Sequence, residues 1–406
     1  MSHVSPFFAV FFCFLFVCVV QAEDSRAVIE LKGHTAPIKS IIFSPDGTKV
    51  VTDGRDAAVK IWDAESGKLL HTLQGSESPS TTLAFSPDGT KIVTAITDGT
   101  AKVWETDSGK ELQTFDTRSA GRIDFAAFFP DGKKVLTPAG SGIYIFVWSV
   151  RPEPGERRRL YPDHTGSGRT HYVTAVAFAP DGEKFVTAGR DGTVQMWETD
   201  SENRLQRKFV GGIQGFLSVA YSPDGKKIVT AGNDRIAQIW DADSRVELKR
   251  LPEERLPDGN MVDSRYAAFS PDGKKVVTTG FGGVVRIWDA ESGEVLQKLE
   301  GHKGRTNYVD RAIFLPDGKK LVTAGHDKTI RVWEVDTGKE LQRLVGYSGE
   351  VRSVALSPDG KKIVFANTET TAQIWDLERL PAPPPAPVYS PISPNAPLVR
   401  PAITDF

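Results

Sequence analysis

A histidine, a threonine and an aspartate recur in the same order along the chain, and these side-chain types could form a nucleophilic catalytic triad. The aspartate follows the threonine by four positions, and a tryptophan follows the aspartate by six. An enzyme needs one such site, whereas packing needs the same contacts many times, so the recurrence indicates architecture. The two fullest sets are His34, Thr52, Asp56 and Trp62, and His302, Thr323, Asp327 and Trp333, and a looser third set is His164, Thr187, Asp191 and Trp197.

These sets belong to a sequence repeat that covers most of the chain. Ser-Pro-Asp-Gly, or a variant of its first residue, occurs eight times, and a tryptophan follows each of the eight prolines by 17 positions, or by 18 in the third copy. Apolar runs of five or six residues, rich in Val, Ile and Thr, lie between the turn residues and are typical of β-strands. Proline presets φ in the turn, and glycine accepts the left-handed conformation that follows. Each copy therefore predicts four short antiparallel strands, named a to d in chain order.

The period, the four strands and the endings IWDA, VWET, VWEV and IWDL resemble the WD-repeat family of β-propellers. The resemblance implies an all-β fold, a single eight-bladed β-propeller of four-stranded antiparallel blades. It also implies that histidine, threonine, aspartate and tryptophan form a buried hydrogen-bonded chain in each full copy, a structural tetrad without a catalytic role.

Several copies depart from the tetrad pattern. Asp98 and Asp234 keep the turn aspartate, but no histidine is correctly placed before either copy. Gly142, Gly282 and Glu369 replace the aspartate in copies three, six and eight, and Phe365 replaces the strand threonine in copy eight. We expect those blades to depend on apolar packing.

The two ends of the repeat region are expected to complete one blade. A strand-like segment at residues 27–31, AVIEL, precedes the first copy, whereas a proline-rich sequence follows the last tryptophan. Pairing this closing strand with the last blade leaves no unpaired edge. We therefore assign residues 23–380 to the propeller, with repeats from about 35 to 376, and residues 381–406 to a disordered proline-rich tail that serves as a spacer or as a docking peptide.

The amino terminus resembles a secretory signal. Residues 7–20 form an apolar run of 14 residues, too short to cross a bilayer comfortably, and Ala22 provides a small residue before a cleavage point. We predict a signal peptide at residues 1–22 and export to a periplasmic or extracellular space, with an uncleaved anchor as the alternative. Export combined with the regular SPDGKK turns suggests a bacterial member of the family.

Composition and motifs exclude several other functions. The net charge of −2 gives no footprint for nucleic acid, and the sequence has no haem-attachment, Walker, dinucleotide or zinc-protease motif. The turn Asp-Thr-Gly-Lys at residues 336–339 is similar to one in quinoprotein dehydrogenases, but no tryptophan follows it at the short spacing of that family. We therefore predict a monomer that is not an enzyme and has no cofactor, bound metal or stable membrane span.

Function is expected at the positions where the copies differ. Strand alternation places the residue before each turn-aspartate position on a rim around the central channel, and arginine, aromatic and histidine side chains there are typical of binding hot spots. We predict a protein-interaction scaffold whose protein or peptide partner contacts Arg55, Arg190, Phe281 and His326. The alternative is a secreted propeller enzyme or small-molecule binder that uses the channel mouth. The eight rim positions are Arg55, Thr97, Ser141, Arg190, Asn233, Phe281, His326 and Thr368.

Overall fold

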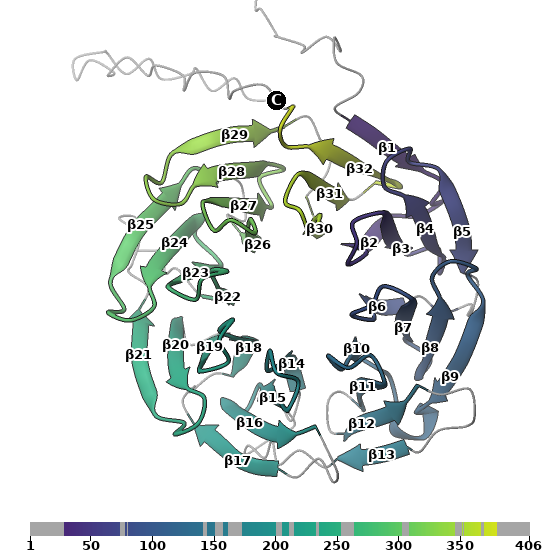
Figure 1. The fold of residues 1–406 in the computed structure, drawn as a ribbon, viewed down its shortest axis with the longest axis horizontal. Helices are drawn as coiled ribbons and strands as arrows, with labels where there is room; N and C mark the ends of the chain where they lie inside the picture. Colours follow the sequence, from purple (N-terminus) through teal and green to yellow (C-terminus); the bar gives the residue numbers. More distant parts are fainter. Residues whose placement is uncertain are drawn as a thin grey trace, which may run out of the picture.

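Eight four-stranded antiparallel sheets surround a central opening (Figure 1). The computed structural model describes residues 28–73, 78, 80–140, 144–150, 157–160, 173–199, 205–210, 215–232, 235–252, 264–302, 308–345, 351, 353–366 and 369–379. The predicted signal peptide at 1–22 and the tail at 381–406 lie outside these residues. The all-β, eight-bladed propeller predicted from the sequence is confirmed.

The strands follow the order predicted for each copy, with strand a innermost and strand d at the outer edge. Blades 1 to 4 contain β2 (Ile38–Phe43), β3 (Lys49–Gly54), β4 (Val59–Asp63) and β5 (Leu69–Leu73); β6 (Ser80–Phe85), β7 (Lys91–Ile96), β8 (Thr100–Glu105) and β9 (Glu111–Asp116); β10 (Ala127–Phe128), β11 (Lys134–Ala139), β12 (Tyr144–Ser149) and β13 (Arg157–Leu160); and β14 (Val173–Phe178), β15 (Lys184–Gly189), β16 (Thr193–Glu198) and β17 (Leu205–Val210).

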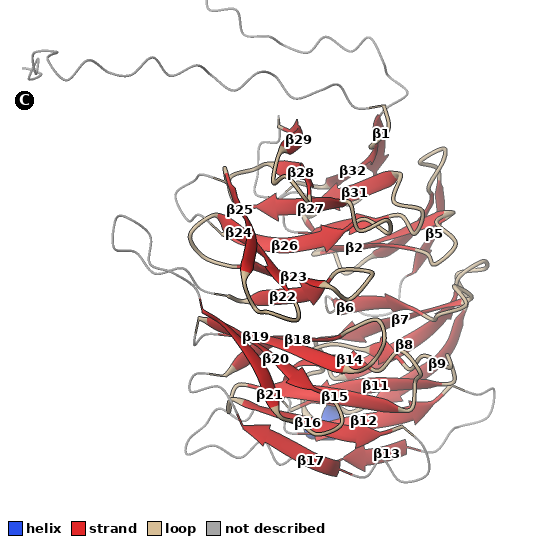
Figure 2. Ribbon diagram, turned by 60° about the vertical axis from the view of Figure 1, so that its left-hand side comes forward, coloured by secondary structure: helices blue, strands red, loops and turns tan. Residues whose placement is uncertain are grey.

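The second half of the ring repeats this arrangement (Figure 2). Blades 5 to 8 contain β18 (Phe216–Tyr221), β19 (Lys227–Gly232), β20 (Ile236–Asp241) and β21 (Glu247–Pro252); β22 (Tyr266–Phe269), β23 (Lys275–Thr279), β24 (Val284–Asp289) and β25 (Val295–Glu300); β26 (Val309–Phe314), β27 (Lys320–Gly325), β28 (Ile330–Glu334) and β29 (Glu340–Leu344); and β30 (Ser353–Leu356), β31 (Lys362–Ala366), β32 (Thr371–Asp376) and β1 (Val28–Lys32). Among the described residues the one helix is the 3₁₀ turn η1 (Arg118–Ala120), and no helix there could cross a membrane.

The ring closes through β1, as predicted from the strand-like segment at residues 27–31. Val28 to Lys32 pair antiparallel with Trp375 to Thr371 of β32, one residue later than the predicted 27–31. Leu31 is fully buried and packs with Ile374 of blade 8 and with Ile38 and Trp62 of blade 1. The first strand of the chain therefore fills both the last sheet and the last junction between blades.

The hydrophobic core consists of eight clusters, and each cluster lies between two neighbouring blades. At the junction of blades 1 and 2, for example, Ile61 and Leu73 pack with Ile92 and Trp104. Every blade therefore depends on its neighbours to cover both of its faces, as expected for a repeat architecture.

The two ends of the channel lie on different faces of the ring. The a–b and c–d turns occupy one face, which we call the proline face because it carries the eight Pro-Asp-Gly turns. The d–a connections and b–c turns occupy the other, which we call the rim face. The glycines of the eight Pro-Asp-Gly turns have φ between 66° and 75°, the left-handed geometry predicted for them. A Cβ added at Gly47 would lie 3.3 Å from Pro358 of the preceding blade, so the turns also pack in a ring.

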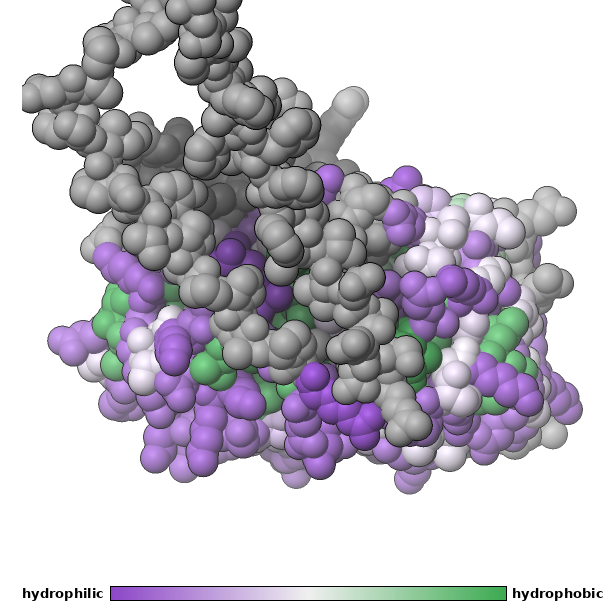
Figure 3. Space-filling model, turned by 90° about the horizontal axis from the view of Figure 1, so that it is seen from above, coloured by the Kyte–Doolittle hydropathy of each residue, from purple (hydrophilic) through white to green (hydrophobic). Residues whose placement is uncertain are grey.

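The d strands form the outer edge of the ring and carry exposed apolar side chains such as Leu69, Leu112 and Leu296. Figure 3 shows part of this edge, where hydrophobic residues form small patches between hydrophilic ones. Small separate patches are normal for a protein surface. The outer edge is therefore a weaker candidate for a binding site than the channel mouth.

Candidate functional site

The tetrad of blade 1 is a continuous hydrogen-bonded chain. Trp62 Nε1 donates to Thr52 Oγ1 at 2.8 Å, Thr52 Oγ1 lies 2.8 Å from His34 Nε2, and His34 Nδ1 lies 3.0 Å from Asp56 Oδ1. Thr52 is fully buried and His34 nearly so. Burial lowers the pKa of His34, and the favourable contact with Asp56 opposes this only in part. A neutral imidazole that donates through Nδ1 and accepts the threonine proton at Nε2 satisfies every bond in the chain.

The tetrad of blade 7 has the same geometry. The distances are 2.8 Å from Trp333 Nε1 to Thr323 Oγ1, 2.7 Å from Thr323 Oγ1 to His302 Nε2 and 2.9 Å from His302 Nδ1 to Asp327 Oδ1. Burial opposes ionisation of Asp327, but bonds to His302 and Thr329 and the charge of Arg331 bring its pKa to about 2. Burial also lowers the pKa of His302.

Neither tetrad has the geometry of a nucleophilic site. The threonine oxygen accepts the indole N–H and shares its proton with the imidazole, and no surface of it is open to a substrate. His164, the histidine of the looser third set, lies outside the described residues. In that blade Trp197 Nε1 donates to Thr187 Oγ1 at 3.1 Å, and Asp191 accepts from Thr193.

The bond from tryptophan to threonine persists in copies that lack the rest of the tetrad. We expected blades 3 and 6 to depend on apolar packing, yet Trp148 donates to Thr137 at 2.8 Å and Trp288 to Thr278 at 2.9 Å. Blade 8 behaves differently because Phe365 replaces the threonine. Its Trp375 is only partly buried and donates to Gln373 Oε1, a residue of the same strand, at 3.0 Å.

The structure brings together two of the four predicted partner-contact residues. The ring of Phe281 in blade 6 lies 5.2 Å from the ring of Tyr308, and Tyr308 lies 5.5 Å from His326 in blade 7. Arg55 and Arg190 are exposed on blades 1 and 4, so they stand on other parts of the rim. Of the remaining rim positions, Thr97 is half-buried, and Ser141, Asn233 and Thr368 lie outside the described residues.

Three further residues join this group, although the sequence reasoning did not select them. Arg265 stacks on Tyr308 with its guanidinium carbon 4.7 Å from the ring centre, and His326 Nε2 lies 2.8 Å from Asp310 Oδ2. We call Arg265, Phe281, Tyr308, Asp310 and His326 the Tyr308 cluster. Its members come from the start of strand a and from the b–c turns. Aligning the residues around the start of strand a in the eight copies would have shown that these positions vary, but not which of them meet.

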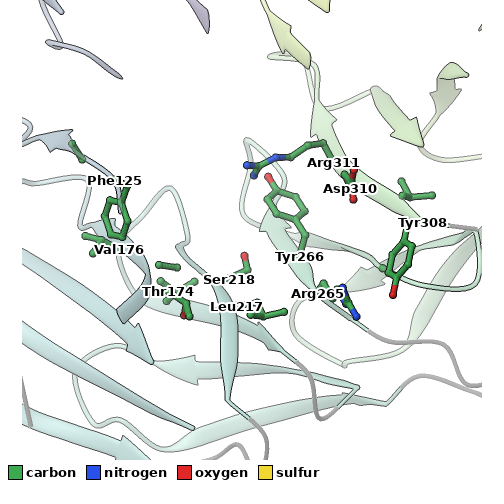
Figure 4. A pocket seen from close by; sticks show the side chains of 15 residues that line it. Phe125, Thr174, Val176, Leu217, Ser218, Arg265, Tyr266, Tyr308, Asp310 and Arg311 are labelled. Carbon is green, nitrogen blue, oxygen red and sulfur yellow. The ribbon is translucent and has the colours of Figure 1, made fainter. Parts of the chain in front are cut away.

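A cavity of about 630 Å³ lies in the channel beside this cluster (Figure 4). The a strands of blades 4 to 7 and the start of blade 3 line it, and Phe125, Thr174, Ser218, Tyr266 and Arg311 are among the lining residues. Arg265, Tyr308 and Asp310 belong to both the cavity wall and the Tyr308 cluster. The rim and the channel therefore form one continuous surface on the side of blades 6 and 7.

The described part of the chain holds no group of three histidine, cysteine, aspartate or glutamate residues that could bind a metal ion. The polar side chains of the cavity are arginine, tyrosine, serine, threonine and a single aspartate. Arginine and tyrosine are side chains that recognise a partner through charge and aromatic contact. The cavity therefore offers charged and aromatic groups to a ligand or partner.

Comparisons with known proteins agree with this architecture. The family described as "WD domain, G-beta repeat" matches residues 25–63, 67–105, 156–198, 204–241, 263–289, 293–334 and 338–376. Most of the third blade lies in the unmatched interval between 105 and 156, where the spacing from proline to tryptophan is also irregular.

One curated protein and one solved structure extend the comparison. The "Protein LST8 homolog" of Drosophila melanogaster is 24% identical over 181 residues, which is 45% of this chain and 58% of that protein. The chain thus spans little more than half the length of that relative. The crystal structure of the computationally designed Ika8 protein has a TM-score of 0.70 and 25% sequence identity, covering 86% of this chain and 98% of that one.

Proposed function

Because this chain belongs to the WD domain, G-beta repeat family, we propose that it is a non-enzymatic interaction scaffold that presents its rim face to a protein or peptide partner in an exported compartment. Members of the family typically bind other proteins. The proposed contact residues are Arg55, Arg190, Phe281 and His326.

The Tyr308 cluster is the observation that carries the proposal. Three aromatic rings, from Phe281, Tyr308 and His326, lie next to one another at the channel mouth, and Arg265 stacks on the central ring. Aromatic and arginine side chains supply most of the binding energy in many protein interfaces. Among the described residues this cluster stands at the junction of blades 6 and 7, whereas the tryptophan–threonine bonds and the turn contacts recur in blade after blade.

The test is joint replacement of Arg55, Arg190, Phe281 and His326 by alanine. We expect loss of partner capture from the exported fraction under mild crosslinking. The variant should stay folded with a small decrease in its unfolding midpoint, because none of the four residues belongs to the buried core but Phe281 and His326 contact Tyr308 across a blade junction. The matched control is joint alanine replacement of four exposed residues on the proline face. Capture that persists in the rim variant would refute the assignment. The four exposed proline-face residues replaced in the control variant are Lys133, Lys226, Lys274 and Lys361.

Export is the second part of the proposal, and it is supported by the apolar segment at residues 7–20 and the small residue Ala22. Sequencing the amino terminus of the protein isolated from the exported fraction would test it. A chain that begins at Glu23 agrees with cleavage, and a chain that keeps residues 1–22 and sediments with membranes supports the anchor.

A second function has one specific observation in its favour. The cavity volume of about 630 Å³ lies within the range of small-molecule sites, about 300–1,000 Å³. An absorbance spectrum and an elemental analysis of the purified protein distinguish the two functions. A stoichiometric chromophore or metal would favour the secreted enzyme or small-molecule binder over the scaffold.

A further inference from the structure

Arg311 is an exposed cation on the wall of the central channel. It belongs to β26 in blade 7, and its guanidinium carbon lies 5.3 Å from the centre of the Tyr266 ring in blade 6. Figure 4 shows the guanidinium beside the Tyr266 ring and directed toward the opening. The Arg311 side chain also hydrogen-bonds to the Tyr266 hydroxyl, so the tyrosine contacts the guanidinium through both its ring and its oxygen.

Among the described residues no carboxylate forms an ion pair with Arg311. The neighbouring Asp310 contacts His326 Nε2 at 2.8 Å. The buried Asp53 of blade 1 has a basic partner in Lys39, with 3.2 Å between Lys39 Nζ and Asp53 Oδ2. Both acidic groups thus have basic partners of their own.

A second arginine stands in the same cavity. Arg265 directly precedes β22 of blade 6 and stacks on Tyr308 of blade 7. Two guanidinium groups and two tyrosine rings therefore alternate across the junction of blades 6 and 7. The cavity wall contains one carboxylate, Asp310, against these two arginines. The wall is therefore complementary to an anion.

The size and lining of the cavity indicate what carries the anion. Apolar side chains of Phe125, Val176 and Leu217 line the opposite wall, and the aromatic rings of the Tyr308 cluster continue from the cavity to the rim. A small free anion would contact only the arginine side. A polypeptide segment could place a carboxylate at Arg311 while its apolar atoms cover the other wall and the rings.

We propose that the channel mouth binds an acidic side chain, aspartate or glutamate, of a partner polypeptide, and that Arg311 is the receptor for the carboxylate. This inference rests on the proposed scaffold function and specifies the chemistry of the partner. Arginine binds carboxylates through two parallel charge-assisted hydrogen bonds, which are stronger than bonds between neutral groups. The ring and hydroxyl of Tyr266 hold the guanidinium at the cavity wall, and its remaining N–H groups can make this bidentate contact.

The experiment is selection of a random 12-residue phage-displayed peptide library on the full chain, followed by anisotropy measurements with the selected peptides. We expect the peptides to share an aspartate or glutamate, and replacement of that residue by glutamine or asparagine to weaken binding at least about tenfold. Arg311→Gln should weaken binding to a similar degree, and Arg311→Lys to a smaller degree. Lys319→Gln removes the same charge from the proline face and should leave the affinity unchanged.

Each result decides between outcomes. Peptides without a shared acidic residue, or peptides that bind Arg311→Gln as tightly as the native protein, would overturn the inference. If such peptides still lose affinity for the joint alanine variant of Arg55, Arg190, Phe281 and His326, the scaffold function stands without the acidic contact. If no selected peptide depends on the rim, both fail. If free glutarate displaces the peptide at a glutarate concentration equal to the peptide's dissociation constant, the site would instead be assigned to a small dicarboxylate.

Discussion

The proline face and the rim face are made by the same eight copies of one sequence, yet they differ in how their charges are used. On the proline face, five lysines at the start of strand b each contact an acidic residue in the c–d turn of the next blade. The pairs are Lys49–Asp107, Lys184–Asp243, Lys227–Glu291, Lys275–Asp336 and Lys362–Glu65. On the rim face the charges change from blade to blade, and Arg55, Arg190 and Arg311 are exposed.

The turn aspartates of the proline face are also fully engaged. Asp88 accepts from Ser86 Oγ at 2.6 Å and from the Thr90 amide at 3.0 Å, and the bond from Ser86 is the main cause of its pKa of about 2. Equivalent serine bonds hold Asp46, Asp224, Asp272 and Asp359. Polar groups that repeat in this way satisfy one another and build the ring, whereas polar groups that vary are available for recognition. The following predictions test that division.

The largest effect is expected from removal of the closing strand. Deleting residues 23–33 takes away β1 and the buried Leu31, which exposes the edge of β32 and opens the junction of blades 8 and 1. Because each blade is covered by its neighbours, we expect the loss of most of the free energy of unfolding. Thermal and urea unfolding of the truncated chain measure this. A truncated protein that melts at the native temperature would contradict closure by β1.

The second largest effect is expected from a tetrad tryptophan. Trp333→Ala should cost about 3–5 kcal/mol of unfolding free energy, because the side chain is buried and its removal leaves a cavity and takes the indole donor from the buried threonine oxygen. Trp375→Ala is the matched comparison, and its cost should be smaller because Trp375 is partly exposed and its indole donates to Gln373 of its own strand instead of to a buried threonine. Equal costs in urea unfolding would show that the threonine bond and the burial add nothing.

These two predictions also show how far the sequence alone reaches. The turn glycines follow from the local spacing of the repeat, and the tryptophan–threonine bonds of the full copies follow from the family resemblance. The closing strand joins the two ends of the chain, and it could be predicted because one strand-like segment was left over before the first copy. The persistence of the bond at Trp148 and Trp288 was not predicted, since we took the histidine and aspartate to be necessary for it. The indole N–H needs only the threonine oxygen.

The Tyr308 cluster could not be predicted in the same way. Phe281 was selected as a rim residue, but its neighbour Tyr308 comes from the d–a connection of the next blade, where the copies differ in length. The contact depends on how one blade is rotated against the next, and the period of the repeat does not determine that rotation. Arg265 and Arg311 were missed for the same reason, because each stacks on a tyrosine of a neighbouring blade.

A smaller effect is expected from pH, through the buried histidines. Burial lowers the pKa of His302 in the folded protein below its ordinary value of 6.5, so below that pH the unfolded chain binds more protons. The buried neutral histidine therefore contributes in full to the free energy of unfolding above pH 6.5, and this contribution is lost as the pH falls below 6.5. Urea midpoints should therefore decrease between about pH 7.5 and about pH 5.

The double variant His34→Gln and His302→Gln identifies the source of this dependence. Its midpoint should be lower than that of the native protein at neutral pH but should change less over the same pH range, since two histidines of lowered pKa are gone. Asp327 provides an internal reference. Its pKa is about 2 in the folded protein against an ordinary value of 3.8, so its contribution to the free energy of unfolding is lost only as the pH falls below 3.8. An undiminished pH dependence in the double variant would assign the effect to other groups.

The smallest effect is expected from the lysine pairs of the proline face. Lys275 Nζ lies 3.4 Å from Asp336 Oδ1, and the aspartate side chain is 75% exposed, so water and salt screen the attraction. Lys275→Met keeps the apolar stem of the side chain and should change the unfolding free energy by about 1 kcal/mol or less, with a smaller change at high salt. Partner binding should not change, because the residue lies on the opposite face from the Tyr308 cluster. A loss of binding in this variant would show that the proline face takes part in recognition, and the division between repeated and varied surfaces would then be wrong.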